Sequence, residues 1–328
     1  MGSRRAKPGF ARRTIRLADP LSTLGRVAEW IDLVDPSEEE LHAALPAAVE
    51  ASALALLVAP AKHADEPRPT LQGHGRYVFG IFLVAVAVPD EDRVYYQEID
   101  AVATHETLVT VSKTPPGEQP FDPRPAKEAC KHDDSAGMML YRLVDSIAER
   151  YLDLIDDVDG EIDELEDVVE TAPAQETRNR ISELRHDLLH IRRTLAPTRD
   201  AIRRIVDNVV EVEEGPEVFP HDVEIAFNSA YDKLLRAFDG LELSRDLIAG
   251  VRDYLQSKVA NDQNEVMKTL TVIASVLLLP TFIVGLYGQN FQHHFPEIHW
   301  QFGYAFSWGV IIATTLIQLA FFRWKKWI

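Results

Sequence analysis

The sequence predicts an α+β protein, in which an N-terminal α/β cytosolic domain precedes a helical hairpin, a long stalk helix and a C-terminal two-helix membrane domain. Three observations lead to this prediction. Strand-like apolar runs come first, a three- and four-residue apolar periodicity follows, and two uncharged stretches come last. The predicted boundaries are 1–128 for the α/β domain, 129–262 for hairpin and stalk, 263–291 for the stalk continuation and first span, 292–302 for an external loop, and 303–328 for the second span with a basic tail.

The composition narrows the possible functions. The 328 residues include 52 acidic and 34 basic side chains, a formal net charge of −18, which argues against a nucleic-acid partner because such partners require a basic face. The single cysteine, Cys130, excludes an intramolecular disulfide framework and a cysteine-based zinc cluster. The sequence contains no Walker motif, dinucleotide turn or nucleophile elbow, so we expect neither an enzyme nor a bound cofactor.

The α/β domain is predicted from one helix and three strands. Pro36 and Ser37 open a short helix that reaches Leu45, with Glu40 as the capping-box partner of Ser37. Apolar, β-branched and aromatic residues predict strands at Tyr77–Val88, Arg93–Thr104 and Thr107–Ser112. The proline-rich segment that follows, Lys113–Pro125, is predicted to be a loop.

From about Ala129 onward the pattern is helical. One apolar series with acidic flanks is Ile155, Val158, Ile162, Leu165 and Val169. A second series with many arginines is Ile181, Leu184, Leu188, Ile191 and Leu195. Because Thr171-Ala172-Pro173 separates them, we predict an antiparallel hairpin with complementary charges, whose apolar faces coiled-coil packing alone would explain.

Two stretches contain no Asp, Glu, Lys or Arg, namely Thr269–Pro296 and Phe302–Phe322. A hydrocarbon core of about 30 Å needs about 20 apolar helical residues, so both stretches can cross a bilayer. One long helix from about Asp222 to Tyr287 is predicted to enter the first span. Basic residues flank the spans, and the loop between them has none, so the positive-inside rule places both termini in the cytoplasm of a multi-pass inner (plasma) membrane protein.

Several C-terminal segments can be compared with a known family: Asn264–Lys268, Gly285–Phe291, Phe295–Glu297 and Lys325–Ile328. Together they resemble the CorA family of divalent-cation channels, strongly over about Val259–Ile328, and the order of elements agrees over the cytosolic part. The resemblance implies a homopentameric funnel in the lipid bilayer, in which the long stalk helix lines the pore.

The family motif Gly-Met-Asn corresponds here to Gly288-Gln289-Asn290, so glutamine replaces the usual methionine. The resemblance implies that Asn290 presents a ring of carbonyl oxygens at the outer pore mouth, which receives hydrated Mg²⁺. This is physically reasonable, because Mg²⁺ gives up its waters reluctantly and neutral acceptors can bind it through its water shell. Gln289 adds a second amide and bears on ion preference.

The same resemblance implies that five further residues line the pore: Asn264, Leu270, Leu278, Thr281 and Gly285. Asn264 and Thr281 are expected as polar stations, and Leu270 and Leu278 as apolar rings that gate by dewetting. The helical spacing of Asn264, Leu270, Leu278 and Thr281 is compatible with one face. The alternative is that both leucines face lipid.

Other candidate residues concern cation attraction and regulation. Glu297 matches a family loop acid that collects cations, and three loop histidines offer imidazole ligands to Zn²⁺, Co²⁺ or Ni²⁺: His293, His294 and His299. Ordinary solvated loop residues are the alternative. In the family, cytosolic Mg²⁺ bound between protomers regulates gating; the stalk acid of that site corresponds to Ser229 here. The site is therefore either weakened or built from other acids: Asp90, Glu91, Asp92 and Asp232.

The preferred hypothesis is a pentameric channel that imports Mg²⁺, with Mg²⁺ as both substrate and regulator. A Zn²⁺ importer of the related ZntB type is a second reading, favoured slightly by the loop histidines and Gln289. A membrane-tethered sensor or scaffold without ion flux is the third.

Overall fold

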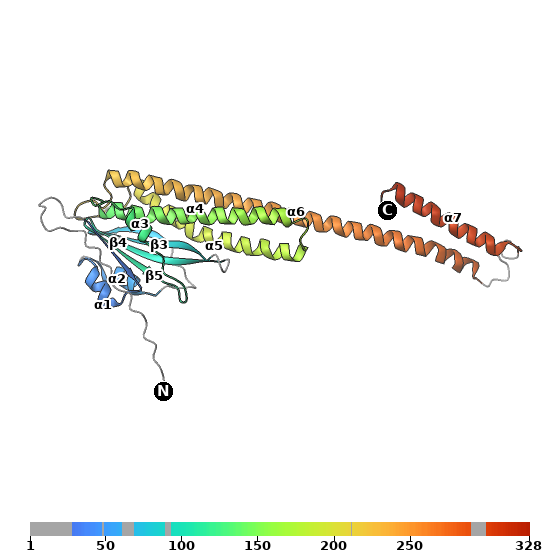
Figure 1. Cartoon of the computed structure of the whole chain (residues 1–328), viewed down its shortest axis with the longest axis horizontal. Helices are drawn as coiled ribbons and strands as arrows, with labels where there is room; N and C mark the ends of the chain where they lie inside the picture. Colours follow the sequence, from blue (N-terminus) through green and yellow to red (C-terminus); the bar gives the residue numbers. More distant parts are fainter. Residues whose placement is uncertain (1–27, 48, 61–68, 89–92, 211, 290–299) are drawn as a thin grey trace, which may run out of the picture. The chain divides into compact units, whose positions relative to one another are not determined.

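The structure, a computed structural model, describes residues 28–47, 49–60, 69–88, 93–210, 212–289 and 300–328. The chain forms two compact units. Residues 1–168 and 177–249 make the first, and residues 169–176 and 250–328 make the second. Figure 1 labels the elements along the chain.

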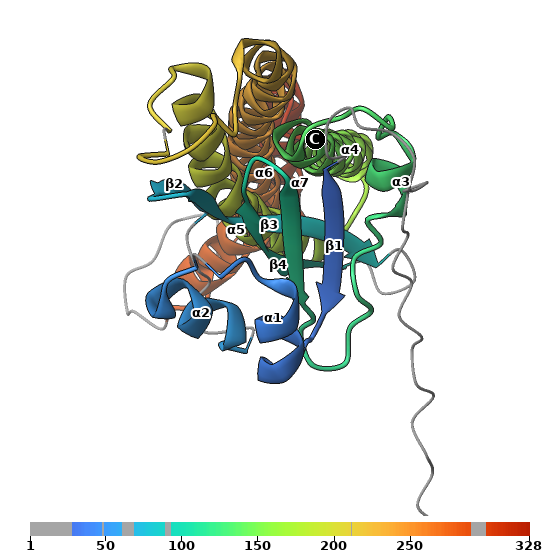
Figure 2. The same ribbon diagram turned by 90° about the vertical axis from the view of Figure 1, so that its left-hand side faces the viewer.

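A five-stranded mixed sheet lies at the centre of the first unit (Figure 2). The strands, in spatial order, are β1 (Glu29–Val34), β5 (Thr107–Lys113), β4 (Arg93–Ala103), β3 (Tyr77–Val88) and β2 (Thr70–His74). β1 pairs with β5 in parallel, and the remaining pairs are antiparallel. The three predicted strands are confirmed, whereas β1 and β2 were not predicted.

Helices cover both faces of this sheet. The short helices α1 (Glu38–Ala44) and α2 (Ala51–Val58) lie on one face, where Leu41 and Leu57 join a buried cluster with β3 and β5 residues. The predicted capping box is confirmed, since Ser37 and Glu40 bond each other's backbone. On the other face, the Tyr151 hydroxyl of α4 donates to the Leu83 carbonyl of β3 over 2.9 Å.

The helical hairpin is confirmed. It consists of α4 (Ala136–Val168) and α5 (Ala174–Val206), and α4 follows the short α3 (Arg124–Glu128). The predicted apolar residues of both helices are buried, and Arg180 of α5 pairs with Glu161 of α4 at 2.7 Å. Helix α4 begins later than Ala129, where the helical sequence pattern starts. The Ser135 hydroxyl accepts a hydrogen bond from the Met138 amide and so caps α4 at that point.

The stalk helix α6 (His221–Tyr287) is continuous over 67 residues, close to its predicted bounds, and includes Pro280. At about 1.5 Å per residue it is about 100 Å long. Its first part is buried against the hairpin; there, the Ser244 hydroxyl donates to Asp159 over 2.6 Å.

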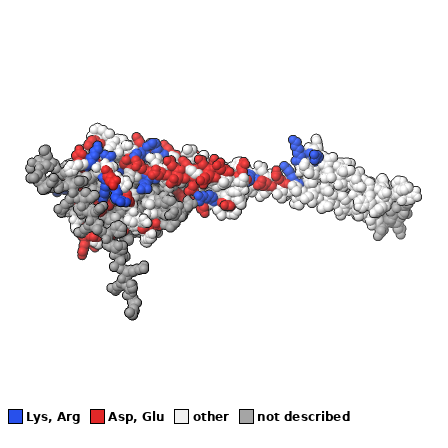
Figure 3. Space-filling model, viewed as in Figure 1, with Lys and Arg blue, Asp and Glu red and all other residues white. Residues whose placement is uncertain are grey.

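The second unit contains the end of α6 and the helix α7 (Gly303–Trp324). Among the described residues, α6 and α7 are the two helices long and apolar enough to cross a membrane, as predicted. The Gln318 side chain of α7 donates to the Ser275 carbonyl of α6 over 3.2 Å. Figure 3 shows Asp and Glu crowded over the helices that precede the candidate spans and a largely uncharged surface over the candidate spans themselves.

Candidate functional site

The Gly288-Gln289 pair of the motif directly follows the last turn of α6. The Gly288 amide donates to the Val284 carbonyl over 2.9 Å, and the Gln289 amide reaches the Leu286 carbonyl only at 3.5 Å. A side chain at position 288 would place its Cβ 3.1 Å from the Val284 carbonyl oxygen, so glycine suits this close approach. Asn290, the third motif residue, lies outside the described residues.

Four predicted pore residues share one exposed side of α6. Helical steps of about 100° place them within an arc of about 80°. All four residues are exposed within this single chain; Leu270 is 57% exposed and Leu278 is 70% exposed. The four residues are Leu270, Leu278, Thr281 and Gly285, and we call them the α6 outer face.

The side of α6 that packs on α7 is a different one. Ser275 accepts the hydrogen bond from Gln318, and Ile283, on the same side, is 8% exposed. Helical steps of about 100° place Ile283 opposite the centre of the α6 outer face and Ser275 about 60° beyond Leu278. Within this chain, α7 therefore leaves the α6 outer face available for a pore or for lipid.

The two polar pore candidates differ in their surroundings. The Thr281 hydroxyl donates to the Leu277 carbonyl over 2.7 Å, which leaves its oxygen able to accept from a hydrated ion. Asn264 lies closer to the α7 side, in a hollow that also includes Lys268 and Trp327. The predicted set is thus split: Asn264 stands at the edge of the face that the other four share.

The regulatory candidates are only partly described. Ser229 and Asp232 are exposed one turn apart on α6. Among the described residues, no group of three or more His, Cys, Asp or Glu side chains is arranged to hold a metal ion. The other candidates lie outside the described residues: Asp90, Glu91, Asp92, His293, His294, Glu297 and His299.

Gln318 was not predicted as part of the site. It is the polar residue through which α7 holds α6, and its side-chain oxygen is buried without a hydrogen-bond partner among the described residues. The sequence did contain a signal, because an amide in the middle of an uncharged span needs a partner in lipid.

Comparison with known proteins identifies the family. Residues 26–326 match the family described as "CorA-like Mg2+ transporter protein". The chain belongs to this family. The predicted family membership is therefore confirmed, and the CorA family is one of transporters.

Two relatives illustrate the similarity. The chain is 35% identical over 193 residues to the cobalt/magnesium transport protein CorA of Thermotoga maritima, which covers 59% of this chain and 53% of that protein. It is 32% identical over 193 residues to the putative metal ion transporter YfjQ of Bacillus subtilis, covering 58% of each. The matched segments thus span little more than half the length of these relatives.

A solved structure extends the fold comparison over nearly the whole chain. The CorA magnesium transporter of Methanocaldococcus jannaschii matches with a TM-score of 0.74 at 20% identity, covering 95% of both chains. At this identity the match shows a common fold: the sheet domain, the long helix and the two candidate spans.

Proposed function

We propose that this CorA-family chain assembles as a homopentamer in the inner (plasma) membrane and imports Mg²⁺, with Co²⁺ and Ni²⁺ as further substrates. The observation that carries the proposal is the family match over residues 26–326. Both termini lie in the cytoplasm. A membrane potential supplies about 2.3 kcal/mol per charge per 100 mV, hence roughly 4.6 kcal/mol for a divalent ion, so no nucleotide is required.

In this proposal, five copies of the α6 outer face surround the ion path. Asn290 and Gln289 receive the hydrated ion at the outer mouth, and Glu297 raises the local cation concentration there. Thr281 and Asn264 then offer polar contacts, whereas rings of Leu270 and Leu278 close the path by excluding water. The exposure of both leucines in the single chain supports this arrangement.

The proposal includes regulation by a cytosolic divalent cation. Asp232 on α6 and the acids Asp90, Glu91 and Asp92 are the groups assigned to it, because Ser229 cannot supply a carboxylate. Bound Mg²⁺ would bridge neighbouring protomers and hold the pore closed. The net charge of −18 per chain supports a need for counter-cations between protomers.

A Zn²⁺ transporter is the second candidate. The chain is 26% identical over 196 residues to the zinc transport protein ZntB of Yersinia enterocolitica, covering 59% of this chain and 57% of that protein. The loop residues His293, His294 and His299 would favour Zn²⁺ over Mg²⁺, since imidazole is a ligand for zinc and not for hard magnesium.

The test measures the uptake of divalent cations into liposomes that contain the protein, at an imposed negative-inside potential. Uptake of Mg²⁺, Co²⁺, Ni²⁺ and Zn²⁺ is compared between wild type and Asn290→Ala. The proposal expects Mg²⁺ entry that falls at least about ten-fold in the variant, equivalent to about 1.4 kcal/mol. Entry of Zn²⁺ alone would support the ZntB reading. Absence of any flux from folded, pentameric protein would favour a tethered sensor or scaffold.

A further inference from the structure

We propose that His186 and His190 of α5 form a binding site for a transition-metal ion such as Ni²⁺ or Zn²⁺, on the cytosolic helical arm and separate from the ion path. The two residues are spaced i, i+4 within a continuous helix. This is the spacing at which two histidines on one helical face bind a single zinc ion. The site does not depend on ion transport.

The geometry of the pair fits chelation. The two ring centroids are 4.6 Å apart, with the ring planes inclined at 63°. Imidazole nitrogens bind these metals at about 2.0–2.1 Å, which places the centroids of two rings on one ion about 4.5–5 Å apart. The ring separation is therefore within the range that a shared ion requires, and binding would turn one nitrogen of each ring toward that ion.

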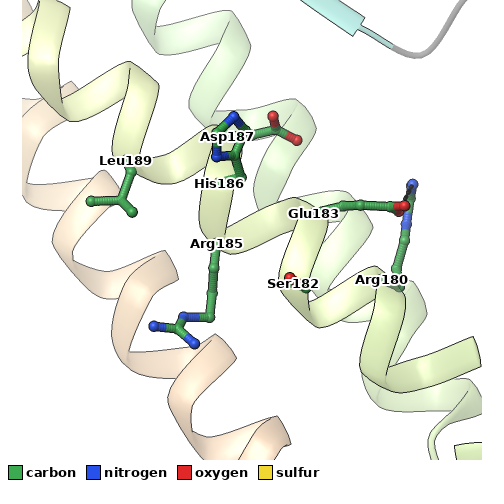
Figure 4. A pocket seen from close by; sticks show the side chains of 7 residues that line it. All are labelled: Arg180, Ser182, Glu183, Arg185, His186, Asp187 and Leu189. Carbon is green, nitrogen blue, oxygen red and sulfur yellow. Dashed lines mark ion pairs between the residues drawn. The ribbon is translucent and has the colours of Figure 1, made fainter. Parts of the chain in front are cut away.

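Two carboxylates stand on the same helical face. Glu183 and Asp187 line an open hollow on α5 together with His186 (Figure 4). Steps of about 100° per residue place these three side chains and His190 within an arc of about 100°. One carboxylate, by rotating its side chain, and water would complete the coordination of an ion held first by the two imidazoles.

The charges around the pair decide which cation is selected. Arg180 also lines the hollow and is engaged with Glu161 at 2.7 Å and with Glu183 at 3.9 Å. Arg185 extends away from His186 and Asp187 (Figure 4). Because Arg180 stands beside Glu183, the net charge of the hollow is not negative enough to attract Mg²⁺ strongly. Coordination by imidazole nitrogen instead favours borderline metals.

The test is calorimetric titration of detergent-solubilised, assembled protein with Ni²⁺. The background carries His293→Ala, His294→Ala and His299→Ala, which removes the three loop histidines proposed above as metal ligands. His186→Ala and His190→Ala are each introduced alone. The matched control is His42→Ala, an exposed histidine in α1 with no histidine one turn away on either side. Thermal melting verifies that each variant is folded.

We expect the background protein to bind one Ni²⁺ per chain at this site. In either single variant the affinity for that ion should fall at least about ten-fold, or about 1.4 kcal/mol, because chelation requires both imidazoles. His42→Ala should bind Ni²⁺ like the background. The proposal is overturned if both single variants bind Ni²⁺ unchanged, or if His42→Ala loses as much affinity. Equal loss of Mg²⁺ binding in the single variants would also overturn it, since that pattern belongs to a carboxylate site.

Discussion

Three ionisable side chains lie buried between the sheet and α2, with Lys113 between two acids. The Lys113 ammonium pairs with Glu98, contacts Asp100 Oδ2 at 2.7 Å and donates to the Leu56 carbonyl over 2.8 Å. Burial, reinforced by the nearby Glu98 and partly offset by Lys113, raises the pKa of Asp100 to about 8. Asp100 therefore keeps its proton at neutral pH.

This cluster predicts how stability depends on pH. The folded protein holds the Asp100 proton up to about pH 8, whereas the unfolded chain releases it near pH 4, so the contribution of Asp100 to the free energy of unfolding falls as pH rises between these values. Asp100→Asn remains neutral throughout. We expect its melting temperature, relative to wild type, to rise from pH 5 to pH 8.

Thermal melting in detergent at several pH values provides the measurement. Asp122→Asn is a useful control, because burial does not dominate there: the hydrogen bond from Arg124 lowers the pKa of Asp122. Parallel pH profiles for wild type and Asp100→Asn would contradict the assignment of a buried, protonated Asp100.

Among the helices, alanine substitution at two glycines of α4 is expected to change stability in opposite directions. A Cβ at Gly137 would lie 2.1 Å from the Val218 carbonyl oxygen, so Gly137→Ala must displace backbone and should destabilise by about 1–3 kcal/mol. A Cβ at Gly160 meets nothing within 4 Å, so Gly160→Ala should stabilise by about 0.5–1 kcal/mol.

Melting temperatures of the two alanine variants test this pair directly, because both substitutions add one methyl group to the same helix. About 2–4 °C per kcal/mol is expected for a unit of this size. A Gly137→Ala variant as stable as Gly160→Ala would show that α4 does not approach the segment before α6 closely.

Helices and strands could be predicted from the sequence where residues close together in the chain determine them. The capping box of α1 and the apolar periodicity of α4 and α5 are set by residues within a few positions of one another, and both were predicted. β1 was missed because its parallel partner is remote: Glu29 pairs with Thr107. β2 was missed because Gly73 and His74 suggest a turn, whereas in the structure they are the last residues of β2 and pair with β3.

The candidate site was predictable to a similar extent. The spacing of Asn264, Leu270, Leu278 and Thr281 indicated one helical face. The structure places the last three on a side of α6 that α7 leaves open, whereas Asn264 stands at the edge of that side. The sequence shows that Gln318 needs a partner, but not that Ser275 is that partner, since this depends on how two distant segments pack. The His186–His190 spacing was visible in the sequence, but only the fold shows the rings close together.

In the whole assembled molecule, the proposed function has apolar rings of Leu270 and Leu278 hold the pore closed. Leu278→Ala would widen one proposed ring and lower the cost of wetting it, so we expect Mg²⁺ uptake to rise under conditions where wild type is closed by cytosolic Mg²⁺. Ile273→Ala removes an exposed side chain about 140° away on the same helix and should leave uptake unchanged. Stopped-flow fluorescence of an Mg²⁺ indicator inside liposomes measures both; equal uptake in the two variants would argue against the ring.

The most direct test asks whether the α6 outer face lines the ion path. Cys130 is the sole cysteine, so a Cys130→Ala background accepts single cysteines for thiol modification. Gly285→Cys is suitable because a Cβ there meets nothing within 4 Å, and Val284→Cys, at the same depth and 61% exposed, is the matched control.

Mg²⁺ uptake into liposomes is measured before and after a cationic thiol reagent is applied from outside. If the α6 outer face lines the ion path, the reagent blocks uptake through Gly285→Cys and leaves uptake through Val284→Cys unaffected. Block of Val284→Cys alone, or of neither variant when labelling of both is verified, would contradict the assignment of this face to the pore.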